Sequence, residues 1–289
     1  MLEHLNPSPR NPARVVVMGS GSFVGGAIAA RAEKEGIPVL ALRRAEVDLL
    51  SSDAPSQLIA LLRPGDAFVA VSAIAPCKDS GMLVENVILA RAMVHALATA
   101  PVSHVVNISS DAIYADGPLP LTEASPAAPT SIHGVMHLAR EFMFRTEVKA
   151  PLAMLRPTLI YGAKDPHNGY GPNRFRRLAA AGKEIVLFGE GEERRDHVLI
   201  DDVAELALRV LTHRSQGALN IASGEVHSFR DVAEKVVKLS GKQVPIKGSP
   251  RSGPMPHNGY RPFDISACRS AFPDFRMTPI DRGLALAHG

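Results

Sequence analysis

The fold is decided by the stretch Arg14-Val15-Val16-Val17-Met18-Gly19-Ser20-Gly21-Ser22-Phe23-Val24-Gly25. An apolar run that ends in turn residues and leads into a helical pattern is typical of a buried parallel strand. The helical pattern continues to Gly36, a residue suited to end a helix. A tight turn that points a helix N-terminus outward is the usual binding site of a dinucleotide pyrophosphate. The stretch therefore predicts a dinucleotide-binding unit, with an ordinary strand–helix turn as the alternative.

The same alternation of strand and helix continues along the chain. We expect strands at residues 38–42, 67–73, 102–108 and 152–156, and helices at about 54–63, 82–99 and 131–148. Such alternation predicts an α/β fold with a doubly wound parallel sheet, the Rossmann type. Gly, Pro, Asn and Arg accumulate at 161–177, and again at 248–262, which predicts loops over a ligand site.

These patterns predict two portions of unequal size. The first is a dinucleotide-binding domain at 1–162, which 196–222 rejoins. The second is a smaller C-terminal substrate-binding portion at 163–195 and 223–289.

Composition excludes several classes of protein. The chain has 289 residues with a formal net charge of +3, too even a balance to indicate nucleic acid or membrane binding. Its two cysteines form no disulfide framework, and its polar N-terminus lacks an apolar signal region. No apolar stretch is expected to approach the ~20 residues that span a bilayer. We therefore expect a cytoplasmic protein without a membrane partner.

The end of the second strand predicts which dinucleotide is bound. An acid at that position favours NAD, whereas arginine accommodates the 2′-phosphate of NADP. The sequence has no acid at the strand tip and places Arg43 and Arg44 there. Guanidinium groups form planar, charge-assisted hydrogen bonds with phosphate. NADP is the predicted cofactor, with NAD as the alternative if the two arginines are only solvated.

Several further motifs together resemble the extended short-chain dehydrogenase/reductase family of epimerases, dehydratases and reductases. The resemblance spans about residues 14–271. It is carried by Asp48-Leu49, Ser72-Ala73-Ile74-Ala75, Asn86, Ser109-Ser110-Asp111-Ala112-Ile113-Tyr114, Arg156-Pro157-Thr158-Leu159-Ile160-Tyr161-Gly162, Gly189-Glu190-Gly191, Arg195-Asp196-His197-Val198 and Asp201-Asp202-Val203-Ala204.

The resemblance implies a nucleotide-diphosphate sugar as substrate. It also implies one set of residues that bind the cofactor and another that bind the substrate. It also suggests a homodimer built on the helices at 82–99 and 131–148. The implied cofactor-binding residues are Gly19, Gly21, Ser22, Phe23, Val24, Gly25, Arg43, Arg44, Asp48, Leu49, Ser72 and Ala73. The implied substrate-binding residues are Asn86, Asp111, Arg195 and Arg261, the two arginines for the diphosphate; a surface salt bridge is the alternative role of either arginine.

The chain departs from the family at its catalytic pair. The family has a tyrosine that transfers the proton, and a lysine four residues later that binds the nicotinamide ribose and lowers the tyrosine pKa. Here the two positions are His133 and His137, which still share one helical face. Imidazole can serve as acid or base near neutral pH, and Ser110 remains to hydrogen-bond a substrate oxygen. Ser22 replaces the middle glycine of the turn, so we expect it to crowd the pyrophosphate.

These departures leave several interpretations open. The enzyme interpretation has His133 replacing tyrosine as acid/base in an oxidoreductase, epimerase or dehydratase. The alternative is a catalytically degenerate dinucleotide-binding sensor or assembly protein. A metal site on the two histidines is disfavoured because no third ligand is evident, and His137 could also be a core residue. A displaced tyrosine is the remaining possibility, with Tyr114, Tyr161 and Tyr170 as candidates.

Overall fold

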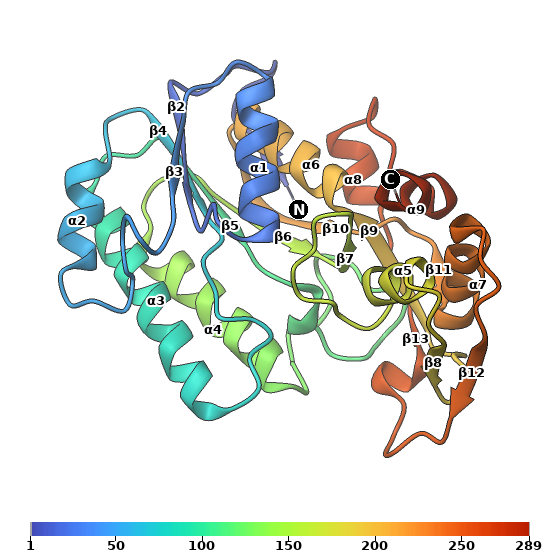
Figure 1. The fold of residues 1–289 in the computed structure, drawn as a ribbon. Coiled ribbons are helices and arrows are strands. Elements are labelled where there is room, and N and C mark those ends of the chain that lie inside the picture. The colour runs from blue at the N-terminus through green and yellow to red at the C-terminus, as the bar shows by residue number, and fades with distance from the viewer. Residues whose placement is uncertain (1, 289) are drawn as a thin grey trace.

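A computed structural model describes residues 2–288 and has a mainly parallel central sheet of seven strands (Figure 1). Its strands are, in spatial order, β1 (Glu3–His4), β10 (Ser215–Ile221), β6 (Leu152–Pro157), β5 (His104–Ile108), β4 (Asp66–Ala70), β2 (Arg14–Met18) and β3 (Val39–Leu42). The order reverses between β3–β2 and β4, which opens a crevice at the carboxyl ends of these strands. The predicted doubly wound Rossmann sheet is confirmed.

Helices cover both faces of this sheet, because its inner strands are apolar on both sides. The helices α1 (Phe23–Lys34) and α6 (Ile200–Thr212) pack together on one face (Figure 1). On the other face lie α2 (Ala54–Leu61), α3 (Ser80–Thr99) and α4 (Ile132–Glu147). Val15, Val16 and Val17 of β2 are fully buried between these two layers. The alternation that predicted the sheet therefore reflects burial on both faces.

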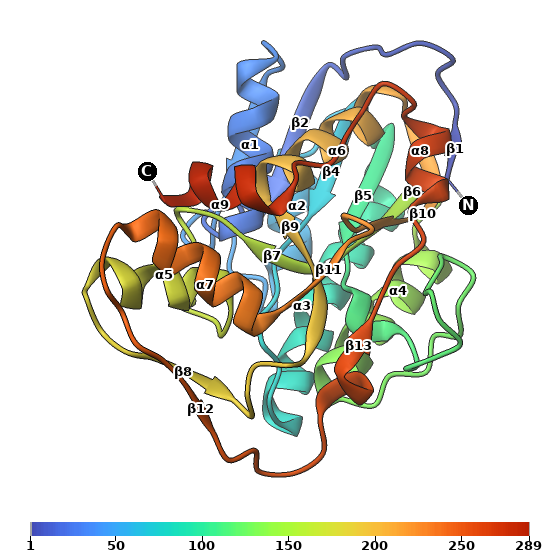
Figure 2. The ribbon, with the colours of Figure 1, turned by 90° about the vertical axis from the view of Figure 1, so that its right-hand side faces the viewer.

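The remaining elements form the smaller part of the molecule, beside the carboxyl edge of the sheet (Figure 2). Its strands are β7 (Leu159–Tyr161), β8 (Ile185–Phe188), β9 (Arg194–Leu199), β11 (Val226–Ser228), β12 (Ile246–Ser249) and β13 (Tyr260–Arg261). Its helical segments are α5 (Pro172–Ala180), α7 (Phe229–Ser240), η2 (Pro256–Gly259) and α9 (Ile280–His288). The remaining helix, α8 (Ser266–Ala271), instead packs against β10 of the central sheet (Figure 2). β9 lies between β11 and β13 and also pairs with β7. It leads directly into α6, which covers the central sheet, so β9 links the two parts of the chain.

Three details differ from the sequence-based expectations. The N-terminus is not a loose leader, because β1 pairs antiparallel with β10 and His4 hydrogen-bonds Ser215 Oγ at 2.7 Å. The segment at 161–177 is not all loop, since α5 starts at Pro172, a residue well suited to a first helical position. The expected loop at 248–262 contains β13 and the short η2.

The expectation about apolar stretches is also wrong for α3. This helix has 20 residues, and by length and composition alone it could cross a membrane. Within residues 2–288 it is the one helix that meets this test. Here α3 packs against α2 and α4 and buries Met93 and Val94, as a core helix does.

A buried polar network joins α4 to the sheet. Arg156 in β6 donates from Nε and Nη2 to Glu141 at 2.9 and 2.8 Å. Its Nη1 donates to the Tyr114 hydroxyl at 2.7 Å, and that hydroxyl donates to Asn220 in β10. A bidentate pair of this kind satisfies both charges and leaves little freedom of orientation. The network therefore anchors α4 to β6 at Glu141.

Two deeply buried histidines predict how stability depends on pH. Burial lowers the pKa of His104 to about 4 and that of His197 to about 3, from an ordinary 6.5. Neither ring nitrogen of His197 has a hydrogen-bond partner in the described part of the chain. A group whose pKa is depressed by folding contributes stability above its unfolded pKa, and this stability is lost as the pH falls.

We expect His197→Phe to raise the free energy of unfolding by about 1–3 kcal/mol at neutral pH, because it removes unsatisfied nitrogens from the core. The gain should grow below about pH 6.5, where the wild-type unfolded state takes up a proton that the folded state rejects. Urea unfolding at about pH 7.5 and about pH 5 measures both effects. His95→Phe, on the exposed side of α3, is the control. Equal pH dependence in wild type and His197→Phe would contradict the assignment.

Candidate active site

The turn between β2 and α1 requires glycine at two positions. Gly19 has a φ of +101°, and a Cβ there would lie 2.7 Å from the Ser72 backbone nitrogen. A Cβ on Gly25 would lie 2.2 Å from the Gly19 carbonyl oxygen. No side chain fits in either place, so the chain turns tightly here and approaches the loop after β4.

Ser22 does not occupy the space above this turn. Its Oγ accepts a hydrogen bond from Gly25 N–H at 3.0 Å and donates to the Gly19 carbonyl at 2.7 Å. The residue is the N-cap of α1, so its hydroxyl is directed into the turn. The expectation that Ser22 crowds a pyrophosphate is not supported by this geometry.

A cavity of about 420 Å³ opens at the switch point beside the turn. Most of the predicted cofactor-binding residues line it. The lining residues are Met18, Gly19, Gly21, Ser22, Arg43, Arg44, Val47, Asp48, Leu49, Leu50, Ser72, Ala73, Ile74 and Leu89. Sequence analysis missed the apolar members of this lining, whose pattern is that of ordinary core residues.

The two predicted phosphate-binding arginines lie at the mouth of this cavity. Arg43 packs across Gly21, where a Cβ would lie 3.4 Å from Arg43 Cγ, and it pairs with Glu46 at 2.9 Å. Arg44 pairs with Asp48 at 3.2 Å. Both guanidinium groups are exposed, so they remain accessible to a ligand.

The cavity and the turn together fit the adenosine and diphosphate part of a dinucleotide. The turn exposes backbone N–H groups at the N-terminus of α1, which attracts negative charge. Phe23 and Val24 have a different place: their side chains pack against the core between α1 and α6. Of the predicted cofactor residues, these two contribute backbone rather than side chain to the turn.

A second close approach positions the catalytic end of α4. A Cβ on Gly134 would lie 2.1 Å from the Ala112 carbonyl, so α4 and η1 (Asp111–Ile113) are in direct backbone contact. Ser110 is the N-cap of η1, and its Oγ lies 3.4 Å from Asp111 Oδ1. The contact brings His133, the neighbour of Gly134, beside Ser110 and Asp111.

His133 is held in one orientation by the loop after β4. The Cys77 N–H donates to His133 Nδ1 at 3.3 Å. Because Nδ1 accepts this bond, the neutral ring carries its proton on Nε2. Burial lowers the pKa of His133, and the nearby Asp111 carboxylate opposes that shift. The ring is therefore mainly neutral at pH 7, with an N–H donor on the side away from Cys77.

His137 lies one turn further along, in a drier environment. Its ring centroid is 4.8 Å from that of His133, in an edge-to-face arrangement. Burial above all, then the charges of His133 and Arg140, hold its pKa well below the ordinary value. Its Nδ1 has no partner among residues 2–288, which also contain no group of three metal ligands. His133 and His137 therefore lie next to each other, as their spacing predicts. Both rings are mainly neutral, so the pair lacks the positive charge that the family's lysine supplies.

The predicted substrate arginines differ in their freedom. Arg195 is near Asp111, with Nη2 at 3.8 Å from Oδ2, and donates to Glu193 at 3.2 Å. Arg261 is fully buried and uses all its donor groups on Asp111, Asp116, His257 and two backbone carbonyls. Arg195 keeps donor capacity for a diphosphate, whereas Arg261 in this arrangement has none to spare.

Asn86 also has a different task from the predicted one. Its Oδ1 accepts from Ile74 N–H at 2.9 Å, and its Nδ2 donates to the carbonyls of Ile74 and Met82. The amide is thus committed to holding the loop that lines the cofactor cavity, so it has no free group for substrate.

The three candidate tyrosines differ in how their hydroxyl groups are placed, and that of Tyr161 has no hydrogen-bond partner within residues 2–288. The hydroxyl of Tyr114 is bound to Arg156 and Asn220, and burial raises its pKa to about 12. The Tyr161 hydroxyl is buried against Gly283, and the Tyr170 hydroxyl accepts from Phe188 N–H. Of the three, Tyr114 is therefore fully engaged, whereas Tyr161 keeps an unpaired but buried hydroxyl.

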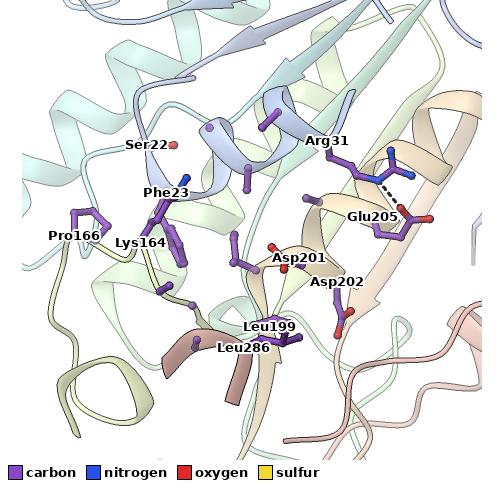
Figure 3. A pocket seen from close by; sticks show the side chains of 18 of the residues that line it. Ser22, Phe23, Arg31, Lys164, Pro166, Leu199, Asp201, Asp202, Glu205 and Leu286 are labelled. Carbon is purple, nitrogen blue, oxygen red and sulfur yellow. Dashed lines mark hydrogen bonds and ion pairs between the residues drawn. The ribbon is translucent and has the colours of Figure 1, made fainter. Parts of the chain in front are cut away.

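A larger cavity, of about 870 Å³, meets the first one at the glycine turn (Figure 3). It shares Gly21 and Ser22 with the first cavity and lies along α1, α6 and α9. Figure 3 shows Lys164 extending beside Phe23 toward the end of α1 that carries Ser22. The pair of Arg31 and Glu205, at 2.7 Å, lies near the opposite end. No sequence pattern predicted this second cavity.

Comparison with known proteins identifies the family. Residues 15–222 match the NAD dependent epimerase/dehydratase family. The chain belongs to this family. Its members include a dTDP-L-rhamnose 4-epimerase from Burkholderia thailandensis, 33% identical over 45% of this chain and 38% of that protein. A second relative is a dTDP-6-deoxy-L-talose 4-dehydrogenase (NAD(P)(+)) from Kitasatospora kifunensis, 26% identical over 90% of each chain.

A solved structure agrees at the level of the fold. The UDP-glucose 4-epimerase of Thermus thermophilus, in complex with NAD, superposes with a TM-score of 0.82 at 22% identity and covers 95% of this chain and 97% of its own. Membership of the epimerase/dehydratase family gives the protein a nicotinamide dinucleotide cofactor, as predicted. The use of histidine where this family has tyrosine remains a prediction.

The contact between α4 and η1 is testable. We expect Gly134→Ala to separate them, because the new methyl group meets a backbone carbonyl that has no room to move. The variant should lose His133 function and about 2–4 kcal/mol of stability. Thermal unfolding and ligand binding measure the two losses. Gly81→Ala, in the first turn of α3, is the matched control, since its Cβ would meet only a side-chain oxygen at 3.3 Å. Equal behaviour of the two variants would refute the contact.

Proposed function

We propose that the protein is an NAD(P)-dependent oxidoreductase or epimerase/dehydratase acting on a nucleotide-diphosphate sugar, with His133 in the role of the usual tyrosine. The proximity of Ser110, Asp111 and His133 to one another, which follows from the backbone contact between α4 and η1, supports this most strongly. The bound dinucleotide would supply hydride transfer to or from a sugar carbon. The side chains of this site then have to bind the reacting oxygen and move its proton.

The three side chains divide that work. Ser110 Oγ donates a hydrogen bond to the reacting oxygen of the sugar. In the arrangement seen, His133 presents Nε2–H to the reacting oxygen as a hydrogen-bond donor. To take up a proton at Nε2, the ring must first adopt the Nδ1–H tautomer and give up the bond from Cys77 N–H; the proton then moves between Nε2 and the reacting oxygen. Proton uptake makes an imidazolium, and the Asp111 carboxylate stabilises it. A neutral ring at pH 7 favours uptake of a proton from an alcohol as it becomes a carbonyl.

The substrate is proposed to lie between the sheet and the smaller part of the chain, at 163–195 and 223–289. Arg195 lies near Asp111, and its guanidinium group has donors left for a diphosphate. Two relatives are named for dTDP-sugars, which supports a sugar nucleotide as substrate. A substrate that already carries two negative charges also suits the exposed guanidinium groups around the site.

This function is tested by hydride exchange between the cofactor and a panel of dTDP-, UDP- and GDP-sugars. We expect His133→Ala to lower kcat by about 10²- to 10⁴-fold, the contribution of a general acid or base. Cofactor affinity should hardly change. His95→Ala on the exposed side of α3 is the control. If the wild type binds cofactor but turns over no sugar nucleotide, the alternative of a dinucleotide-binding sensor replaces this one; the uncharged His137 is the observation that favours it.

We propose NADP as the preferred cofactor. Arg43 lies across Gly21 at the mouth of the adenosine cavity, and no acid stands at the tip of β3 to hold a free ribose 2′-hydroxyl. Glu46 and Asp48 pair with the two arginines from one side only, so a phosphate can still contact them.

Arg43→Gln should weaken NADP binding by about tenfold or more, which corresponds to one charged hydrogen bond. NAD binding should stay within about twofold, because NAD has no 2′-phosphate to lose a contact. Titration with the reduced cofactors, followed by their fluorescence, measures both affinities. Arg91→Gln on the exposed side of α3 controls for net charge. An equal effect on both cofactors would rule out a role in selection.

We also propose a cytoplasmic homodimer that associates through α3 and α4. Val84 and Phe142 are each 59% exposed on these helices, and Val135 is 42% exposed. Large apolar side chains that share one helical layer are typical of an interface between subunits. The molar mass in solution, from light scattering, decides between monomer and dimer.

A further inference from the structure

Arg140 is a buried guanidinium group that the proposed mechanism does not yet use. It lies on α4 and is 3% exposed. Its Nε donates to Asn107 Oδ1 in β5, and its Nη1 donates to the carbonyl of Ser72. Its Nη2 is buried and has no hydrogen-bond partner within residues 2–288. The side chain thus joins α4 to the loop of the cofactor cavity.

Arg140 differs from the other deeply buried arginines in its charge balance. Arg156 is paired with Glu141, and Arg261 with Asp111 and Asp116. No carboxylate in the described range forms an ion pair with Arg140. Burial lowers the pKa of Arg140 to about 10, so the group stays positive at neutral pH. The guanidinium lies over the Phe144 ring, 5.3 Å from its centroid, but no carboxylate in the described range balances its charge. A buried charge without a counterion is normally destabilising.

The position of this charge relates it to the catalytic pair. Arg140 follows His137 by three residues, so the two side chains are neighbours on one helical face. The Ser72 carbonyl that it binds belongs to the loop that lines the dinucleotide cavity. The family resemblance places a lysine at His137, where this chain has a neutral ring. A positive charge is thus present one helical turn further on, behind the same loop.

We propose that Arg140 is a positioning residue that supplies the fixed positive charge of the catalytic helix in place of the missing lysine. It acts through the Ser72 loop and through His137, and the phosphates of the bound dinucleotide balance its charge. This inference rests on the proposed function only for the roles of His133 and His137, since the effect on cofactor binding stands by itself.

The charge also helps to keep His137 neutral, after burial and the charge of His133. His137 is faced by His133 and Arg140 on α4, while His133 is faced by Asp111 from η1 and by the Cys77 N–H of the loop. A cation beside His137 opposes a second positive charge in the same dry space. His137 then meets the nicotinamide ribose as a neutral hydrogen-bonding group, with the long-range attraction coming from Arg140.

The first test compares cofactor affinity in three variants. We expect Arg140→Gln, which keeps hydrogen-bonding groups but removes the charge, to weaken NADP binding by about tenfold or more. Arg140→Lys keeps the charge and should stay within about threefold of the wild type. Arg91→Gln removes an exposed charge from the neighbouring helix α3 and is the control. Binding is measured on protein shown to be folded by circular dichroism.

The second test is an NMR titration of the histidine rings in the cofactor-free protein. The His137 pKa should rise in Arg140→Gln and stay well below its ordinary value in Arg140→Lys and in the wild type. If Arg140 has only a structural role, Arg140→Gln and Arg140→Lys should lower the stability of the protein by similar amounts. NADP affinity should then not depend on whether residue 140 is charged. Equal binding by Arg140→Gln and the wild type, or an unchanged His137 pKa, would overturn the proposal. If Arg140→Gln does not fold, the test uses Arg140→Lys alone. A raised His137 pKa in that variant would also overturn the proposal.

The outcome is separable from that of the proposed function. If His133→Ala turns over substrate as fast as the wild type, His133 is not the acid or base. Cofactor binding that depends on the charge at residue 140 would still support the positioning role of Arg140. Conversely, an active enzyme whose cofactor binding ignores the charge at 140 would keep the function and refute the positioning role.

Discussion

The ion pair between Arg156 and Glu141 is the constraint on which the site depends. Both groups are buried, and each satisfies the other through two hydrogen bonds. Removal of Glu141 would leave Arg156 without a carboxylate in the core, at a cost of about 3–5 kcal/mol, whereas Glu141 also pairs with Arg145. The pair fixes the rotation of α4 about its own axis, and His133, His137 and Arg140 all lie on that helix. A small rotation would move all three away from the carboxyl edge of the sheet at once.

Much of the fold could be predicted because its causes are local. Val15, Val16 and Val17 precede a glycine turn that only glycine can make, and these residues determine β2 and its crossover. The elements that were missed lack such a signal: β1 has two residues and exists only because β10 offers a free edge. The start of α5 at Pro172 was hidden in a segment whose composition is that of a loop.

The sequence predicted which residues lie at the candidate site better than it predicted which groups those residues hydrogen-bond. The cavity at the switch point contains most of the residues expected there, because motif positions follow from the strand ends. Arg261 and Asn86 were expected to face a substrate, but their donor groups are taken by Asp111, Asp116 and Ile74. Arg140 was overlooked, since a lone basic residue in a helix usually lies on the solvent side. Only tertiary packing against Asn107 and Ser72 shows otherwise.

The serine cap of α1 has a consequence for how binding energy is distributed. With glycine at position 22, the Gly25 N–H would be free for a phosphate oxygen; here Ser22 Oγ already accepts it. The helix is complete before any ligand arrives, so little ordering is needed on binding. One donor fewer faces the diphosphate, however, and a larger share of the affinity must come from the adenosine end. In this chain, the residues that distinguish the two dinucleotides therefore also supply much of the affinity for NADP.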